Sequence, residues 1–539
     1  MYYNGPFDMG GEVVVVGFGA AGAVAAMTAS DEGREVLILE KQREDRRRPN
    51  SRFSGGLFIC PSDVDAAEHY MRQLYRKNED LFETDPAVIR TWAEETSSNL
   101  EWLRENGGSA IQVSDHGEHD AIEGYESISL YKPDMNEHPR TGHKGWGYGL
   151  FKFLLDEVES RPIRIVYQAS AEWLLTNADG VVVGVSVIHK GRRRYVKASR
   201  AVVMTCGGFE FNDWMKLNYL RVHPTLFYGN PENTGDGVRM VQEVGGDLWH
   251  MNSCAARFVA HFEGSGYPGG TPVDFWGVTK RGVFVAGVEQ YVKGDSRGDQ
   301  GAPSPSVANI PVAQTYVDSS GTDLPGCIVT DRYGFRHTNE VYRAHVLYYE
   351  LLNLDSHRLE YPKVPSWWIF DSRRVEMGRL TAEQFGPSGP LQEVPWSADN
   401  APEIERGWIR SSDSIRGLAD LCGMDSAVLS RTLSTYNAYC TAGEDPEFGR
   451  PSGTLTPLDR PPYYAVQLWP GGPNTQGGGR RDASARIMSV RGGVVPHLYS
   501  AGEFGSIYGM LYPSGGGNIG ECLAFGRVAG RNAAAEVPV

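Results

Sequence analysis

Apolar residues form short, unbroken runs in the first part of this chain. Two of these runs, residues 13–16 and 36–39, flank an alanine-rich stretch of helical composition that ends near Asp31. Short apolar runs bounded by turn residues are typical of strands buried in a parallel sheet. The pattern therefore predicts a strand, a helix and a second strand over residues 12–40, as in α/β proteins.

The same pattern predicts further elements. Residues 63–106 have helical, amphipathic spacing. Runs typical of strands occupy residues 163–167 and 181–188, and a buried strand at 202–206 leads into two glycines. Further helices are expected over residues 147–159, 238–244, 340–352, 411–441 and 519–535.

The composition changes near residue 255. Residues 262–325 are rich in glycine, proline and aromatic side chains, without a clear long period. Aromatic residues are too frequent there for a disordered linker, so we expect an inserted domain with loops over a site. Residues 461–464, Pro-Pro-Tyr-Tyr, mark the return to the first domain.

A glycine-rich turn, Gly17 to Gly22, joins the first strand to the helix, and the second strand ends on Glu40. Gly17 permits a tight turn, Gly19 lets the backbone approach a pyrophosphate, and Gly22 allows close packing of helix and strand. The helix N-terminus offers unpaired N–H groups to phosphates. Glu40 is placed to bind a ribose diol, so the unit predicts a dinucleotide site.

Composition and charge exclude several function classes. The 539 residues are 41% hydrophobic and 22% charged, and the net charge of −15 disfavours binding to nucleic acid or anionic membranes. No apolar run approaches the roughly twenty residues that span a bilayer, and no secretory signal precedes the first strand. Seven cysteines without a CxxC pair argue against disulfides and a clustered metal site. We therefore expect a cytoplasmic protein without a metal.

More motifs follow the glycine turn in a fixed order: Ser54-Gly55-Gly56, Thr205-Cys206-Gly207-Gly208, Thr234-Gly235-Asp236-Gly237, Phe335-Arg336-His337-Thr338-Asn339-Glu340, Asn474-Thr475-Gln476-Gly477-Gly478, and Leu498 to Glu503. Together they resemble the fumarate reductase and 3-ketosteroid dehydrogenase flavoprotein superfamily. The resemblance implies an α/β fold with a Rossmann-like FAD-binding domain in two segments, 1–258 and 455–539. It also implies an inserted α+β capping domain, 259–454, that closes over the flavin.

The resemblance implies FAD as the cofactor. NAD is the losing alternative, because Gly515 to Gly520 also fits GxGxxG but lacks a surrounding strand-helix-strand unit with a trailing acid. The residues expected to bind FAD are Gly17, Gly19, Ala20, Ala21, Gly22, Glu40, Lys41, Ser51, Ser54, Gly55, Gly56, Ala169, Cys206, Gly207, Asp236, Gly502, Glu503, Gly517, Asn518 and Ile519. A helix starting at Gly517–Ile519 would stabilise the anionic reduced flavin.

The sequence departs from the fumarate reductase pattern at three places. Asn474 stands where a histidine is expected, residues 251–254 lack a second histidine, and Ser514-Gly515 replace an arginine. A His-Pro-Thr stretch does occur at residues 223–225, but it precedes the glycine turn at 235–237. A dicarboxylate needs fixed cations around both of its ends, so these losses argue against such a substrate.

The stretch from Tyr512 to Gly516 is instead similar to the Tyr-Pro-Gly-Pro-Gly of ketosteroid Δ1-dehydrogenases. The resemblance implies that the Tyr512 hydroxyl and the Gly516 N–H polarise a substrate ketone. It offers Tyr342 for proton transfer with a ketone substrate, or Arg343 if the substrate carries an acid. Tyr131 resembles a further active-site tyrosine of that family.

These parts imply an FAD-dependent oxidoreductase that acts on a CH–CH bond next to a carbonyl, by dehydrogenation or ene-reduction. The expected substrate is an apolar, multi-ring ketone such as a 3-ketosteroid, with a separate electron donor or acceptor. The aromatic residues expected to suit it are Phe262, Tyr267, Phe275, Trp276, Phe284, Tyr291 and Tyr316. Two alternatives stay open: an ene-reductase of an unsaturated mono-acid, and a flavoprotein that only relays electrons.

Overall fold

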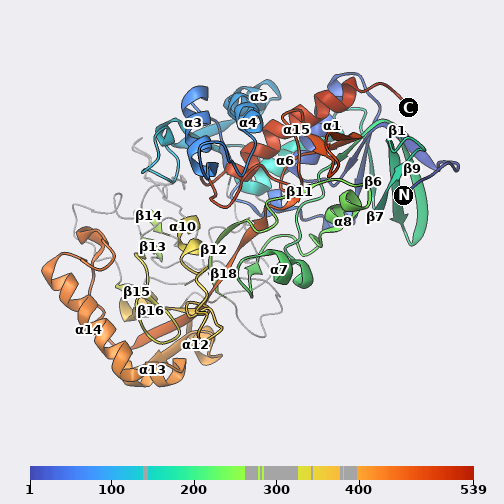
Figure 1. Cartoon of the computed structure of the whole chain (residues 1–539). Coiled ribbons are helices and arrows are strands. Elements are labelled where there is room, and N and C mark those ends of the chain that lie inside the picture. Colours follow the sequence, from blue (N-terminus) through green and yellow to red (C-terminus); the bar gives the residue numbers. More distant parts are fainter. Residues whose placement is uncertain are drawn as a thin grey trace. The chain divides into compact units, whose positions relative to one another are not determined.

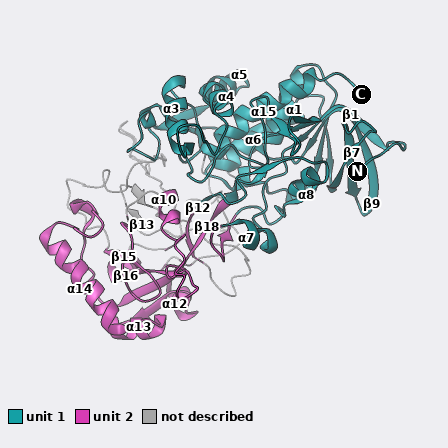
Figure 2. Ribbon diagram, in the orientation of Figure 1, with its two compact units in different colours: residues 1–220, 229–255, 474–539 teal, residues 221–228, 256–473 magenta. Residues whose placement is uncertain are grey.

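The computed structural model describes residues 1–137, 144–260, 277–279, 282–284, 326–340, 344–376, 380, 397 and 399–539. They form two compact units (Figure 2). Unit 1 contains residues 1–220, 229–255 and 474–539, and unit 2 contains residues 221–228 and 256–473. Unit 1 thus returns to its own fold after the chain has passed through unit 2. The domain boundaries expected at 258/259 and 454/455 stay a prediction.

A mostly parallel sheet forms the centre of unit 1 (Figure 1). Its strand order is β20-β21-β9-β1-β2-β6, and every neighbouring pair is parallel except β20 with β21. The bounds are β1 (Met9–Val16), β2 (Val36–Glu40), β6 (Arg164–Tyr167), β9 (Arg192–Met204), β20 (Arg486–Met488) and β21 (Val494–Ser500). Val13 to Val16 are buried against neighbours on both sides, which explains their unbroken apolar run. The predicted strand-helix-strand unit is confirmed.

Helix α1 (Ala20–Asp31) packs against α15 (Gly517–Ala535), so the two ends of the chain meet. Small residues make this approach possible. A Cβ atom added at Gly526 would lie 2.8 Å from the Cβ of Val24, and one at Gly530 would lie 2.6 Å from the carbonyl oxygen of Ala25. The alanine-rich sequence of α1 therefore serves close helix packing.

The remaining elements of unit 1 extend this core. Strands β7 (Ala169–Thr176) and β8 (Val182–His189) pair antiparallel with each other, and β8 pairs with the first half of β9. The other elements are β3 (Phe58–Ile59), β4 (Ala110–Ser114), β5 (Leu130–Pro133), β11 (Leu248–Trp249), β19 (Gly478–Gly479), α2 (Asn50–Phe53), α3 (Val64–Tyr75), α4 (Pro86–Ser97), α5 (Asn99–Glu105), α6 (Trp146–Glu159), α7 (Asp213–Tyr219) and α8 (Asp236–Glu243). Side chains of Asp63 and Asp85 cap α3 and α4 at their N-termini.

Unit 2 has its own sheet, in which β16 pairs antiparallel with β15 and β18. Helices α13 and α14 supply apolar side chains to a core that also contains residues of β15, β16 and β18. The bounds are β10 (Leu226–Phe227), β12 (Cys254–Ala260), β13 (Gly277–Thr279), β14 (Gly282–Phe284), β15 (Cys327–Thr330), β16 (Ser366–Asp371), β17 (Arg410–Ser412), β18 (Tyr463–Thr475), α10 (Ala344–Tyr349), α11 (Ser372–Glu376), α12 (Ala401–Glu405), α13 (Ile415–Cys422) and α14 (Ser426–Ala442).

The stretch predicted to be helical over 411–441 forms two helices, α13 and α14. Gly423 ends α13 with φ +72, a left-handed conformation that glycine adopts without strain. Asp425 then starts α14, and its carboxylate accepts hydrogen bonds from the N–H groups of Ala427 and Val428. A C-cap followed at once by an N-cap separates the two helices.

Within the ranges given above, no helix combines the length and the apolar character needed to cross a membrane. All seven cysteines are free thiols. The described residues also contain no cluster of His, Cys, Asp and Glu that could hold a metal ion.

Candidate functional site

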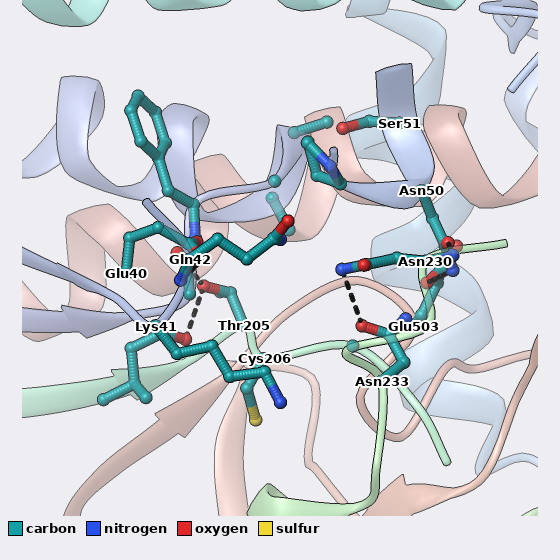
Figure 3. A pocket seen from close by; sticks show the side chains of 18 of the residues that line it. Glu40, Lys41, Gln42, Asn50, Ser51, Thr205, Cys206, Asn230, Asn233 and Glu503 are labelled. Atoms are coloured by element: carbon teal, nitrogen blue, oxygen red, sulfur yellow. Dashed lines mark hydrogen bonds between the residues drawn. The ribbon is translucent and has the colours of Figure 1, made fainter. Parts of the chain in front are cut away.

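A cleft opens in unit 1 at the carboxyl ends of β1, β2 and β9 (Figure 3). In α/β sheets of this kind, ligands bind beyond the carboxyl ends of the strands. Of the residues predicted to bind FAD, the following line the cleft: Gly17, Gly19, Ala20, Ala21, Glu40, Lys41, Ser51, Ala169, Cys206, Gly207, Asp236, Glu503 and Ile519.

The three glycines of the first turn differ in their surroundings. Gly17 has φ +102, and a Cβ there would lie 2.5 Å from the carbonyl oxygen of Thr205. A Cβ at Gly22 would lie 2.2 Å from the carbonyl oxygen of Gly17. At Gly19, however, the nearest atoms would be 3.7 Å away, on Pro49 and Ser51. The absence of a side chain at Gly17 and Gly22 therefore permits close backbone packing, whereas its absence at Gly19 leaves open space in the cleft.

Glu40 is buried at the end of β2 and ties the turn to the strand. Its carboxylate accepts hydrogen bonds from the N–H of Phe18 at 2.9 Å and from the N–H of Gln42 at 2.8 Å. Burial raises the pKa of this carboxyl above its usual value, and the two N–H groups oppose that shift. Glu40 is thus a fixed acceptor in the cleft wall.

Lys41 contributes a cation to the cleft. Its ammonium donates to the Asp236 carboxylate at 2.9 Å and to the Thr234 hydroxyl at 3.4 Å, and it lies 3.9 Å from the Glu232 carboxylate. Asp236 starts helix α8. The ion pair between Asp236 and Lys41 therefore brings the motif around Gly235 into the cleft wall.

A polar network missed by the sequence analysis lies at the other end of the cleft. The Asn50 amide donates to Glu503 at 2.9 Å and to Glu210 at 3.3 Å, and its oxygen accepts the N–H of Asn230 at 2.6 Å. The Asn230 amide in turn donates to Asn233 (Figure 3). The sequence signals this network only through the turn-forming composition around residues 230–235. The partners of Asn50 lie 160 or more positions away along the chain, so no local pattern joins them.

Two buried polar atoms in this region have no hydrogen-bond partner among the described residues. They are the Ser51 hydroxyl oxygen, in the cleft wall, and one carboxylate oxygen of Glu210. Unsatisfied buried polar atoms usually mark a ligand or water site. Together with the open space at Gly19 and the uncapped first turn of α1, they fit an elongated ligand that carries phosphates and hydroxyls.

The other residues predicted to bind FAD lie outside the set that lines this cleft. Gly22 and Gly502 serve backbone packing, since a Cβ at Gly502 would lie 2.8 Å from the Cβ of Ala21. Ser54 and Gly55 follow α2, and Gly56 packs against Trp146. Gly517 and Asn518 form the first turn of α15.

The loop before α15 brings Tyr512 to the helix N-terminus. The N–H of Asn518 donates to the Tyr512 hydroxyl oxygen at 2.8 Å. Gly516 has φ +78 at the N-cap position, where a Cβ would lie 3.0 Å from the backbone of Leu57 and Phe58. Tyr512 and Gly516, predicted from one motif, thus share one helix start.

The other predicted catalytic residues are distributed differently. Tyr131 lies in β5 and stacks on Phe58, with ring centroids 5.9 Å apart. Tyr342 and Arg343 lie outside the described residues. So do the predicted aromatic residues Phe262, Tyr267, Phe275, Trp276, Tyr291 and Tyr316 and the side chain of Phe284.

The amide of Asn474, where the fumarate reductase pattern predicts a histidine, makes hydrogen bonds through both its oxygen and its nitrogen. Its oxygen accepts the Asn518 amide at 2.7 Å, and its nitrogen donates to the Thr475 carbonyl at 2.9 Å. The Gln476 amide donates to the Asn518 oxygen at 3.0 Å. These contacts hold Asn518 in place, so Asn474 stabilises the helix start.

Comparison with known proteins agrees with this geometry. The family described as FAD binding domain matches residues 12–261 and 309–519. Digoxin reductase of Eggerthella lenta is 25% identical to this chain, and the alignment covers 98% of this chain and 87% of the reductase. A cytochrome-type fumarate reductase of Shewanella frigidimarina is 24% identical, covering 97% of this chain and 77% of its own length.

A similar solved structure is the 3-ketosteroid Δ1-dehydrogenase of Sterolibacterium denitrificans. The TM-score is 0.77 at 21% identity, with coverage of 97% of this chain and 99% of that chain. The predicted two-segment FAD-binding fold and the predicted cofactor, FAD, are therefore confirmed. The chain belongs to the FAD binding domain family and is an FAD-dependent oxidoreductase related to fumarate reductases and 3-ketosteroid dehydrogenases.

Proposed function

We propose that this enzyme oxidises or reduces a C–C bond next to the carbonyl of an apolar, multi-ring ketone such as a 3-ketosteroid. The observation that carries the proposal is the hydrogen bond from the Asn518 N–H to the Tyr512 hydroxyl oxygen. This hydrogen bond fixes the Tyr512 hydroxyl at the first turn of α15. We infer that the hydroxyl donates to a substrate carbonyl when the substrate binds there.

The position of Tyr512 strengthens such a donor. The N–H that reaches its oxygen belongs to the first turn of α15, where the helix dipole is positive. Withdrawal of electron density from the phenol oxygen makes the O–H a better hydrogen-bond donor. With the Gly516 N–H as a second donor, this arrangement would stabilise enolate character and so acidify the α-hydrogen.

Bound FAD supplies the two-electron oxidation and reduction chemistry. We propose that the residues predicted to bind it, from Gly17 to Ile519, hold it in the cleft and at the first turn of α15. We propose Tyr342 as the group that moves the α-proton, or Arg343 if the substrate carries an acid. Their ordinary pKa values, about 10 and above 12, require a pocket that shifts them. A separate electron donor or acceptor completes the cycle.

Two findings support a ketone substrate. The structurally similar dehydrogenase of Sterolibacterium denitrificans was solved with 1,4-androstadiene-3,17-dione. The Asn474 amide is also engaged by Thr475 and Asn518, so it offers less to a substrate carboxylate than a histidine would. A dicarboxylate is disfavoured on this ground.

The mono-acid reductase remains a second candidate because of Arg257 in unit 2. This guanidinium is 8% exposed and lies 3.3 Å from the His345 ring. Among the described residues no Asp or Glu forms an ion pair with it, and its Nε and Nη1 have no hydrogen-bond partner. A buried guanidinium without a counter-charge suits a carboxylate.

Tyr512→Phe tests the ketone proposal. We expect turnover of a 3-ketosteroid to fall by about 10²-fold while FAD stays bound, because one oxyanion donor is lost. Tyr508→Phe is the matched control, since its hydroxyl donates to the Gly517 carbonyl at 2.9 Å inside the protein. Equal turnover of Tyr512→Phe and wild type would remove Tyr512 from the mechanism. A selective loss of 2-enoate reduction in Arg257→Met would favour the second candidate.

A further inference from the structure

Two carboxyl groups in unit 1, one buried and one partly exposed to the cleft, share a hydrogen-bond donor. Glu210 follows β9 and is 0% exposed, and Glu503 follows β21 in the wall of the cleft. The same amide nitrogen of Asn50 donates to Glu503 Oε2 at 2.9 Å and to Glu210 Oε1 at 3.3 Å. The two carboxyl groups are therefore bridged by one neutral group.

In the part of the chain that the structure describes, neither carboxyl group has a cation to balance it. Within the described part of the chain, no Lys, Arg or His forms an ion pair with Glu210 or Glu503. The nearby cation of the cleft, Lys41, is paired with Asp236 at 2.9 Å. A buried negative charge beside a second carboxylate without a counter-ion is strongly unfavourable.

The other groups that face the pair are neutral. The N–H of Thr475 donates to Glu210 Oε1 at 3.2 Å. The Asn233 amide also interacts with the Glu210 carboxyl, which partly opposes the rise in its pKa. Cys522, on α15, and Cys206, after β9, are the neighbouring thiols of the cleft. Burial raises the pKa of both thiols to about 12, so they stay uncharged near neutral pH.

We propose that Glu210 and Glu503 form an acid pair that holds one proton between them, so that this wall of the FAD site carries one negative charge instead of two. The unpartnered second oxygen of Glu210 is the natural position for that proton. Burial and the neighbouring carboxylate raise the pKa of Glu210 well above its usual value. Burial also raises the pKa of Glu503, to about 7. As in other carboxyl dyads, the titration belongs to the pair.

The shared proton links FAD binding to pH. The diphosphate of FAD is itself negative, so a second charge on the pair weakens its binding. The dissociation constant of FAD should stay constant where the pair keeps its proton. It should rise up to about tenfold per pH unit where the proton is lost. A single glutamine substitution prevents the doubly charged state.

The experiment measures FAD binding to the apoprotein by flavin fluorescence, from about pH 6 to about pH 9. In wild type we expect the dissociation constant to rise in the upper part of this range. In Glu210→Gln and in Glu503→Gln it should stay flat there. Glu94→Gln, which removes an exposed carboxylate outside the cleft, should keep the wild-type rise. The same rise in all variants would overturn the proposal.

Infrared spectroscopy of the wild-type holoenzyme gives a second test that needs no variant. We expect a protonated-carboxyl C=O band, sensitive to D₂O, near neutral pH, and its loss at the alkaline pH where FAD binding weakens. Absence of such a band near neutral pH would also overturn the proposal. Neither measurement uses turnover, so the proposed ketone activity can fail without affecting this result.

Discussion

The carboxylate of Glu118 accepts a hydrogen bond from the backbone N–H of Gly515, in the loop that carries Tyr512. The adjacent His119 ring donates from Nε2 to the Tyr512 carbonyl at 2.9 Å, since a carbonyl can only accept. The Tyr70 hydroxyl donates to the next carbonyl, that of Pro513, at 2.6 Å. Side chains from residues 70–119 thus fix the position of this loop.

Removal of the Glu118 contact should therefore slow the reaction without releasing the cofactor. We predict that Glu118→Ala lowers kcat by about ten- to a hundredfold, because a small displacement of a catalytic group is costly. Glu118→Gln keeps an oxygen acceptor and should lose less. Steady-state kinetics with a flavin-content assay measure both effects. Unchanged kcat in Glu118→Ala would show that the loop does not depend on this contact.

Alanine substitution should affect folding at one glycine of the first turn and FAD binding at another. Gly22→Ala places a methyl group 2.2 Å from the Gly17 carbonyl oxygen, so we predict loss of folded protein. Gly19→Ala has 3.7 Å of clearance and a φ of −98, so the protein should fold but bind FAD poorly. Thermal unfolding and flavin content separate the two outcomes. Full flavin content in Gly19→Ala would contradict the role given to the open space.

A buried ion network stabilises unit 2. Arg336 donates to Glu340 at 2.7 and 2.8 Å and lies 2.8 Å from Asp445, and Arg450 lies 3.1 Å from Glu340. We predict that Arg450→Met lowers the free energy of unfolding by about 3–5 kcal/mol, because it removes one partner of a buried ion pair. Arg460→Met, which breaks the exposed pair with Glu376 at 2.9 Å, should cost at most about 1 kcal/mol. Equal effects in urea unfolding would contradict the difference in burial.

The same network predicts loss of stability in acid. Burial alone would raise the pKa of Glu340, but Arg336 and Arg450 outweigh it and hold the pKa below its usual value of 4.5. The unfolded chain therefore takes up a proton first, and stability falls as pH drops below about 4.5. Asp445, whose pKa Arg336 lowers despite burial, adds to the effect at lower pH. Urea midpoints that stay constant from about pH 6 to about pH 3 would refute this prediction.

Local patterns predicted part of the molecule well. The unit over residues 12–40 was predictable because buried strands, a glycine turn and an alanine-rich helix all lie within one short stretch. The pair Glu210 and Glu503 was not, since their proximity depends on a fold that brings β9 and β21 together. The break at Gly423 was missed because apolar spacing continues across it, while a C-cap glycine interrupts the backbone.

The most direct test of the proposed chemistry is anaerobic mixing of the oxidised holoenzyme with a saturated 3-ketosteroid, followed by addition of 3-keto-enones and 2-enoates to the photoreduced enzyme. We predict that the ketosteroid bleaches the visible absorption of the flavin, or that the enone restores it. Tyr512→Phe should slow whichever of these changes the wild-type enzyme shows. If neither compound class alters the spectrum, or if only 2-enoates do, the ketone proposal is contradicted.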